Sequence, residues 1–77
     1  MEANDRNLIL ELLERDSNLK RLYLEHEELE QQLEEYNGRS FLTADEEMEE
    51  KRLKKMKLHG VDRMMAILYE HRVSAAA

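Results

Sequence analysis

Apolar residues in the first half of the chain recur at steps of three and four between residues 19 and 36. The positions that share this spacing are Leu19, Leu22, His26, Leu29, Leu33 and Tyr36. Alternating steps of three and four place side chains along one side of a helix, which is the heptad pattern of coiled coils. The pattern runs into Asn37-Gly38, a pair that tolerates positive φ and often ends a helix. A second periodic run follows, so the pattern predicts a helical hairpin.

The first helix is expected to run from about residue 4 to residue 36. Asn4 is a suitable N-cap, because its side-chain oxygen can accept from a free amide of the first turn. The weakest part of this helix is the Asp-Ser-Asn run at residues 16–18, whose side chains compete for backbone hydrogen bonds. Either Asp16 or Ser17 can cap a new helix there. We favour one continuous helix; the alternative is a short first helix that joins the next through a kink near Asp16.

The second helix is expected to run from Ala44 to about His71, after a connector at residues 37–43. Thr43 and Glu46 have the spacing of a capping box, in which each side chain satisfies a backbone amide of the other residue. Residues 72–77 are expected to fray at the end of the chain.

The apolar side of the second helix is broad enough for two neighbouring seams. One seam contains Leu53, Gly60, Met64 and Ile67, and the other contains Leu58, Val61, Met65 and Leu68. One seam can pack on the first helix while the other stays free for a second chain, which is how hairpins build four-helix bundles.

The composition agrees with an all-α fold and favours self-association. Hydrophobic residues make up 42% of the 77 residues and charged residues 39%, so apolar side chains must lie in stripes. There is no proline, and Glu, Leu, Lys and Arg are abundant, which is typical of long helices. Ordering each residue costs roughly 1–2 kcal/mol of backbone entropy, and a hairpin of this size buries little surface. We therefore expect a single hairpin domain, residues 1–77, that forms a dimer or a higher helical oligomer.

Charge and cysteine content limit the expected location and partners. The chain has no cysteine, which fits a cytoplasmic protein. Its polar, acidic start and its short apolar runs predict neither a signal peptide nor a membrane span. The formal net charge of −6 argues against a general nucleic-acid binder.

Two strings of residues together resemble a known family. The first is Asp16 followed by Leu19-x-x-Leu22-x-x-x-His26-x-x-Leu29. The second is Leu42-Thr43-x-Asp45-Glu46, followed by Lys51-Arg52-Leu53-Lys54-Lys55-x-Lys57-Leu58 and Asp62. In their order and spacing they resemble the YdcH-like proteins, small bacterial proteins grouped as domain of unknown function 465.

The resemblance covers about residues 16–68 and has three departures. Gly60 and Val61 stand where the family usually has Leu-Lys, and Leu19 stands where an aromatic residue is common. The resemblance implies a bacterial helical hairpin capable of self-association. It implies no activity and no cofactor.

His26 is the one residue whose surroundings hint at metal chemistry. The run from His26 to Glu30 begins like the zinc-protease motif His-Glu-x-x-His, but Glu30 replaces the second histidine. No third ligand follows at a recognisable spacing. We therefore interpret His26 as a polar seam residue that sets register, and as a group that can make association pH-sensitive. No metal, cofactor or catalytic set is expected, and the protein is not expected to be an enzyme.

A basic segment, residues 51–57, leads into the middle of the expected second helix. Five of its seven residues are positively charged: Lys51, Arg52, Lys54, Lys55 and Lys57. A hairpin that closes over residues 37–42 would bring Lys51–Lys54 opposite Glu25–Glu28, and we prefer this pairing because the segment has no aromatic residue to stack on bases. The alternative is a face that contacts phosphates.

The function expected from the sequence is a small protein-interaction or scaffolding module without enzymatic activity. The predicted association face consists of Leu22, His26, Leu29, Leu33, Leu53, Leu58, Val61, Met64, Met65 and Leu68. The alternative function is a nucleic-acid-associated accessory protein that uses Lys51–Lys57.

Overall fold

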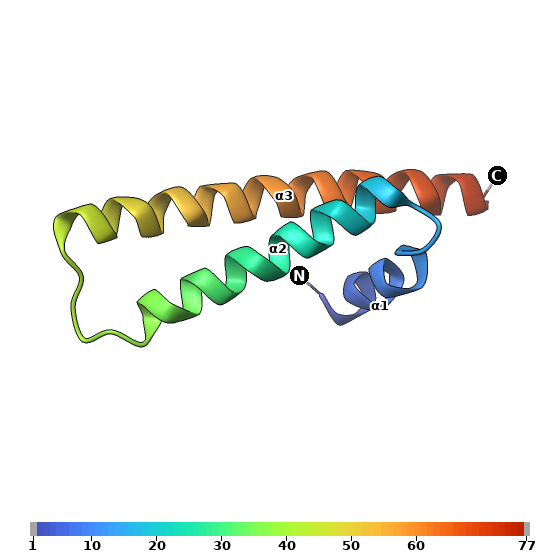
Figure 1. The fold of residues 1–77 in the computed structure, drawn as a ribbon. Coiled ribbons are helices and arrows are strands. Elements are labelled where there is room, and N and C mark those ends of the chain that lie inside the picture. Colours follow the sequence, from blue (N-terminus) through green and yellow to red (C-terminus); the bar gives the residue numbers. More distant parts are fainter. Residues whose placement is uncertain (1, 77) are drawn as a thin grey trace.

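Three α-helices make up the computed structural model, which describes residues 2–76 (Figure 1). Helix α1 spans Ala3–Leu12, α2 spans Ser17–Asn37 and α3 spans Ala44–Ala76. Helices α2 and α3 run antiparallel, and α1 folds back beside them at the end where α3 terminates (Figure 1). The all-α class is confirmed. The expected two-helix hairpin is present as α2 and α3, with α1 as a third helix.

The expected continuous first helix is wrong, because the chain turns between α1 and α2. The N–H groups of Arg15 and Asp16 donate to the Leu12 carbonyl over 2.9 Å and 3.0 Å, which closes a turn after α1. Asp16 then has an extended backbone, and its Oδ1 accepts from the Leu19 N–H over 3.0 Å. This is an N-cap, and it begins α2. The alternative of a short helix capped at Asp16 is the one that the structure contains.

The turn after α1 lets the first helix pack against the other two. It leaves Ile9 fully buried and Leu12 8% exposed, in one cluster with buried side chains of α2 and α3. Burial of two such side chains is worth about 1.5–3 kcal/mol each, which favours the turn.

Two other helix ends differ from expectation. Helix α1 begins at Ala3 with Glu2 at its N-cap and no side-chain cap, so Asn4 is not the cap. The C-cap of α2 is Gly38, with φ −77° and ψ −6°, and no residue that the structure describes has positive φ. The Gly38 N–H donates to the Glu34 carbonyl, which ends α2 in a right-handed turn without a left-handed glycine.

The start of α3 is as expected, and its end is not. The Glu46 N–H donates to Thr43 Oγ1 over 3.2 Å, and the Thr43 N–H donates to Glu46 Oε1 over 3.1 Å. The predicted capping box is therefore confirmed. The helix continues through Ala76 instead of fraying after His71, while residue 77 lies outside the described residues.

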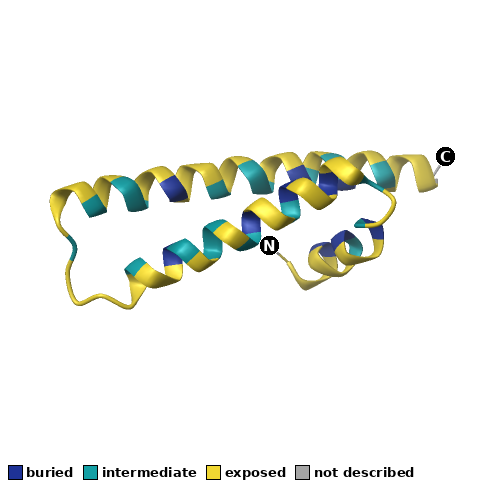
Figure 2. Ribbon diagram, in the orientation of Figure 1, coloured by how far each residue is buried: buried dark blue, intermediate teal, exposed yellow. Residues whose placement is uncertain are grey.

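The core lies at the end where all three helices meet. Its buried side chains are Ile9, Leu12, Leu19, Leu22, Met64 and Leu68. Figure 2 shows most of the buried positions gathered around α1 and the adjoining parts of α2 and α3. Two polar contacts close this end: Arg72 donates to Asp5 over 2.7 Å, and His71 Nε2 lies 3.1 Å from Asp16.

The register of the hairpin differs from the expected one by about two helical turns. Lys57 Nζ lies 3.2 Å from Glu30, and His71 lies beside Asp16, so the two helices are level at these pairs. The connector at residues 38–43 runs outward before α3 begins, so α3 starts beyond the end of α2 (Figure 1). This overhang shifts every partner of α2 along α3, and the predicted pairing of Glu25–Glu28 with Lys51–Lys54 is wrong.

Candidate functional site

An open groove runs between α2 and α3 near the middle of the hairpin. Its volume is about 360 Å³. Apolar atoms of Leu22, Leu29 and Met56 contribute to its lining, and polar side chains of both helices surround them. Grooves with an apolar lining and a polar rim are typical of surfaces that bind another protein.

A second hollow extends the groove toward the start of α2. It has a volume of about 340 Å³, and Leu22 and Arg63 line both hollows. Its remaining lining residues are Asn18, Arg21, Ala66 and Ile67. Because the two hollows share walls, they form one continuous surface along α2 and α3, which we call the α2–α3 groove.

The α2–α3 groove lies on the side of the hairpin away from α1. No described residue of α1 lines either hollow, whereas Val61 and Met65 of α3 pack against the core cluster that contains Ile9 of α1. Successive residues of a helix are about 100° apart, so Arg63 lies about 200° from both Val61 and Met65. Arg63 lines the groove. Helix α1 therefore covers one face of the hairpin and leaves the groove face without a partner helix.

Around the first hollow, the two rims of the groove carry opposite charge. Helix α2 contributes Glu25 and Glu28 there, whereas α3 contributes Arg52 and Arg63. Arg21 of α2 lines the second hollow. The carboxylate of Glu25 accepts from Arg21 on its own helix over 3.4 Å. Arg63 forms no ion pair among residues 2–76, so its charge is available to a partner.

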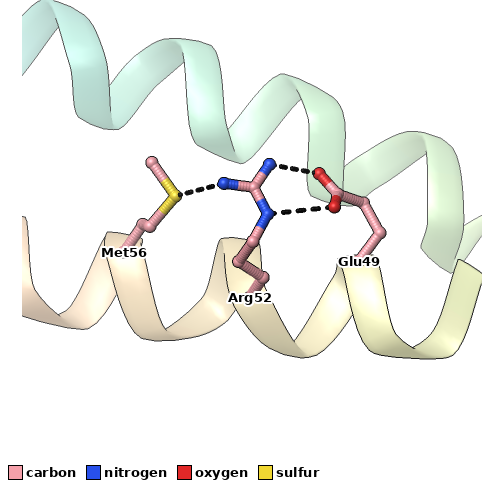
Figure 3. Close-up of polar contacts among 3 residues, drawn as sticks. All are labelled: Glu49, Arg52 and Met56. Atoms are coloured by element: carbon pink, nitrogen blue, oxygen red, sulfur yellow. Dashed lines mark hydrogen bonds and ion pairs between the residues drawn. The ribbon is translucent and has the colours of Figure 1, made fainter.

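Arg52 is held in place at the groove by its neighbours on α3 (Figure 3). Its Nε and Nη2 donate to the two carboxylate oxygens of Glu49 over 3.0 Å and 2.5 Å, and Nη1 lies 3.2 Å from the sulfur of Met56. The hydrogen bonds and charge of Arg52 lower the pKa of Glu49, and those of Glu49 raise the pKa of Arg52. This chain of contacts orients the guanidinium along the helix, next to the exposed part of Met56.

Gly60 leaves part of the groove bare. A Cβ atom built on Gly60 would have no heavy atom within 4 Å beyond its own surroundings on the helix. The space over this glycine is therefore not filled by α1 or α2, and it adds to the depth of the groove. A glycine in a helix interior is destabilising by about 1 kcal/mol relative to alanine.

The side chain of His26 is buried between α2 and α3 and is only partly satisfied. It is 5% exposed, and its Nε2 lies 3.3 Å from Glu30 Oε1, while Nδ1 has no hydrogen-bond partner. Glu27 Oε1 is also buried without a partner. Burial raises the pKa of Glu30, whereas the hydrogen bond and charge of Lys57 and the charges of His26 and Arg6 lower it. The lowering effects outweigh burial, so the pKa of Glu30 lies below its ordinary value.

His26, Glu27 and Glu30 have the chemistry of metal ligands. Their ligand atoms lie within 4.8 Å of one another. However, Lys57 Nζ lies 3.2 Å from the Glu30 oxygen that His26 contacts. An ammonium group at this distance already neutralises the carboxylate and repels a cation, so the arrangement is a half-buried ionic contact between the two helices.

The residues of the predicted association face are used largely within the chain. Buried are Leu22, His26, Leu33, Leu53, Met64 and Leu68, and half-buried are Leu29, Val61 and Met65. Leu58 is 62% exposed and does not line the groove. Only four residues of this face line the groove: Leu22, His26, Leu29 and Leu53.

Several groove residues were not part of the predicted face. Met56, Glu25 and Arg63 line the groove, and their position depends on where α1 packs. Met56 is 46% exposed, and its spacing from Gly60 and Arg63 was a signal in the sequence that these residues share one side of α3.

Three of the five basic residues at positions 51–57 are paired. Arg52 contacts Glu49, Lys54 Nζ lies 3.4 Å from Glu50, and Lys57 contacts Glu30. Lys51 and Lys55 form no ion pair within residues 2–76. Two of the acidic partners, Glu49 and Glu50, lie on α3 itself. The third, Glu30, lies on α2, nearer the connector than the expected partners at residues 25–28.

Within residues 2–76, no helix combines the length and apolar character needed to cross a membrane.

Comparison with known proteins adds no relative to these observations. No family model, curated protein or solved structure matches the chain.

Proposed function

We propose that this protein is a non-enzymatic interaction or scaffolding module that self-associates through the α2–α3 groove. The observation that carries the proposal is the continuous groove on the face that α1 leaves uncovered. Its apolar lining, formed by side chains such as Leu29 and Met56, would be removed from water by a partner. Removal of apolar surface from water is worth about 25 cal/mol per Å² and drives most protein association.

The small size of the protein supports association as well. Only eight hydrophobic side chains are buried in the described chain, and large ones such as Met56 and Leu24 remain 46% and 57% exposed. A core of this size supplies little stability beyond the entropy cost of ordering the chain. Association would add burial in the half of the hairpin that α1 does not reach.

The proposal includes the class and location of the protein. We place it with the YdcH-like bacterial proteins on the two strings of residues that it resembles, and in the cytoplasm because it has no cysteine. No cofactor is part of the proposal, because the buried His26 contacts are explained by packing between the helices.

The phosphate-binding alternative has less support. Arg52, Lys54 and Lys57 are engaged by carboxylates, which leaves Lys51 and Lys55 as the unpaired cations of the segment. Two exposed lysines on an acidic chain give a weak electrostatic attraction to nucleic acid, because affinity rises with the number of phosphates contacted.

Sedimentation equilibrium of three proteins tests the proposal. Met56→Glu places a charge in the groove, whereas Leu58→Glu places the same charge on an exposed residue of α3 outside the groove. We expect the wild type and Leu58→Glu to form dimers or larger oligomers as concentration rises, and Met56→Glu to stay monomeric. Equal helicity of the three proteins by circular dichroism would show that the variants are folded. A wild type that is monomeric throughout, or equal association of all three proteins, would contradict the proposed surface.

A further inference from the structure

We propose that the α2–α3 groove is filled by a second copy of this chain, related by a two-fold axis that runs along the helices. In this arrangement, α2 of each copy packs antiparallel on α3 of its partner, and both connectors lie at the same end. The inference rests on the proposed function and adds the identity of the partner and the orientation of the two copies.

Two contacts within the chain show which residues of α2 and α3 lie at the same height, or level, along the hairpin axis. Glu30 is level with Lys57, and Asp16 is level with His71. The same offset places Glu25 level with Arg63, within one residue. It also places Glu28 level with His59. All four side chains of these two pairs line the groove.

A two-fold axis along the helices exchanges α2 and α3 without changing these levels. Glu25 of each copy then faces the partner's Arg63, and Glu28 faces the partner's His59. Because the interface is isologous, each pair occurs twice. The acidic rim of one copy meets the basic rim of the other, and complementary rims of this kind fix the orientation of an interface.

The alternative axis lies across the helices and opposes like charges. It places α2 on the partner's α2 and α3 on the partner's α3. The carboxylates of Glu25 and Glu28 would then face carboxylates, and Arg63 would face cationic groups. Juxtaposition of like charges is costly at an interface, so charge selects the axis along the helices.

The shape of the groove agrees with this arrangement. Helix α1 lies on the outer face of each copy, so it does not obstruct the approach of the groove faces. The bare surface over Gly60 lies within one turn of the level of Leu29. It therefore has room for the partner's Leu29, as small residues commonly allow at close helix contacts.

A mixing experiment with charge-reversed variants tests the orientation. In a homodimer of Glu25→Arg, arginine faces arginine at both pairs, and in a homodimer of Arg63→Glu, glutamate faces glutamate. In a dimer of the two variants, both pairs are again of opposite charge. We expect each variant alone to dimerise at least about tenfold more weakly than the wild type. An equimolar mixture should form heterodimers with close to wild-type affinity, measured by sedimentation and by native mass spectrometry.

Charge reversal on α1 provides the control. Glu11 is exposed on α1, on the other face of the hairpin, so Glu11→Arg should dimerise like the wild type and should not prefer either groove variant. The rescue occurs between chains, so restored contacts within one chain do not explain it.

The outcomes separate the two proposals. A wild-type protein that remains monomeric contradicts both self-association and this orientation. A wild-type dimer whose single variants still dimerise normally, or whose mixture shows no preference for the heterodimer, overturns the orientation alone and leaves self-association intact.

Discussion

Asp16 and His71 are 55 positions apart in the chain, yet Nε2 of His71 lies 3.1 Å from Oδ2 of Asp16. The other oxygen of the same carboxylate accepts from the Leu19 N–H over 3.0 Å. One side chain thus begins α2 and joins it to the last part of α3. The chain also turns from α1 into α2 at this position, so the contact lies where the three helices meet.

Removal of the Asp16 carboxylate should destabilise the fold. Loss of an N-cap usually costs about 0.5–2 kcal/mol, and Asp16→Ala should lower the free energy of unfolding by about that amount. Asp16→Asn is the matched control, because asparagine can still cap α2 but carries no charge for His71. Urea denaturation should show a smaller loss for the asparagine variant. Equal stability of Asp16→Ala and the wild type would show that α2 does not depend on this cap.

The stability of the protein should fall at acid pH because of Asp16 and Glu30. Hydrogen bonds from the Leu19 N–H and from His71 lower the pKa of Asp16 below its ordinary value of 3.8. The pKa of Glu30 is raised by burial but lowered more by Lys57, His26 and Arg6, to below 4.5. A carboxylate with a lowered pKa in the folded state stabilises the protein fully above its unfolded pKa. That contribution is lost as pH falls through the lower, folded pKa.

Variants identify the groups that cause this loss of stability at acid pH. The free energy of unfolding of the wild type should decline below about pH 4.5, where the unfolded chain begins to bind more protons than the folded chain. Combining Asp16→Asn with Glu30→Gln should flatten the decline and lower the stability at neutral pH. Parallel curves for this double variant and the wild type would assign the acid sensitivity to other carboxylates.

Leu68→Ala should be among the substitutions that lower the stability of the fold most. The Leu68 side chain is fully buried in the cluster between the three helices. Truncation of a buried leucine to alanine costs about 2–5 kcal/mol through lost transfer energy and the cavity left behind. Leu24→Ala is the control, because Leu24 is 57% exposed on α2. Thermal unfolding should separate the two variants clearly, and similar midpoints would place the core elsewhere.

Gly60→Ala should have opposite effects on folding and association. A Cβ at this position meets no atom within 4 Å, and alanine is favoured over glycine in a helix by about 1 kcal/mol. The variant should therefore be more stable at concentrations where the protein is monomeric. Its methyl group would fill part of the groove, so its dimerisation constant should weaken. Denaturation and sedimentation measure the two effects separately, and tighter association of the variant would show that Gly60 is not at the contact.

The elements that the sequence predicted well are those set by local signals. The heptad at residues 19–36 predicted the body of α2, and the Thr43–Glu46 capping box predicted the start of α3. Both depend on neighbouring residues alone. The break at residues 13–16 depends instead on tertiary packing, because it places Ile9 and Leu12 in the cluster that all three helices share.

The groove was predicted only in part for the same kind of reason. An unpaired side of α3 was expected from its broad apolar surface. Which residues line it depends on the face that α1 covers, and this is a tertiary choice. Leu58 and Met56 illustrate the point: both are exposed apolar residues of α3, but only Met56 lines the groove. The register of charges was missed because the path of the connector is not encoded in the spacing.

The most direct test of the account is a series of NMR spectra of the wild-type protein recorded on dilution. If copies meet through the α2–α3 groove, amide shifts should change with concentration at groove positions such as Leu29, Gly60 and Arg63. Those of α1 should remain nearly constant. Spectra that do not change over the whole concentration range, or changes centred on α1, would contradict the claim that this groove is where the protein associates.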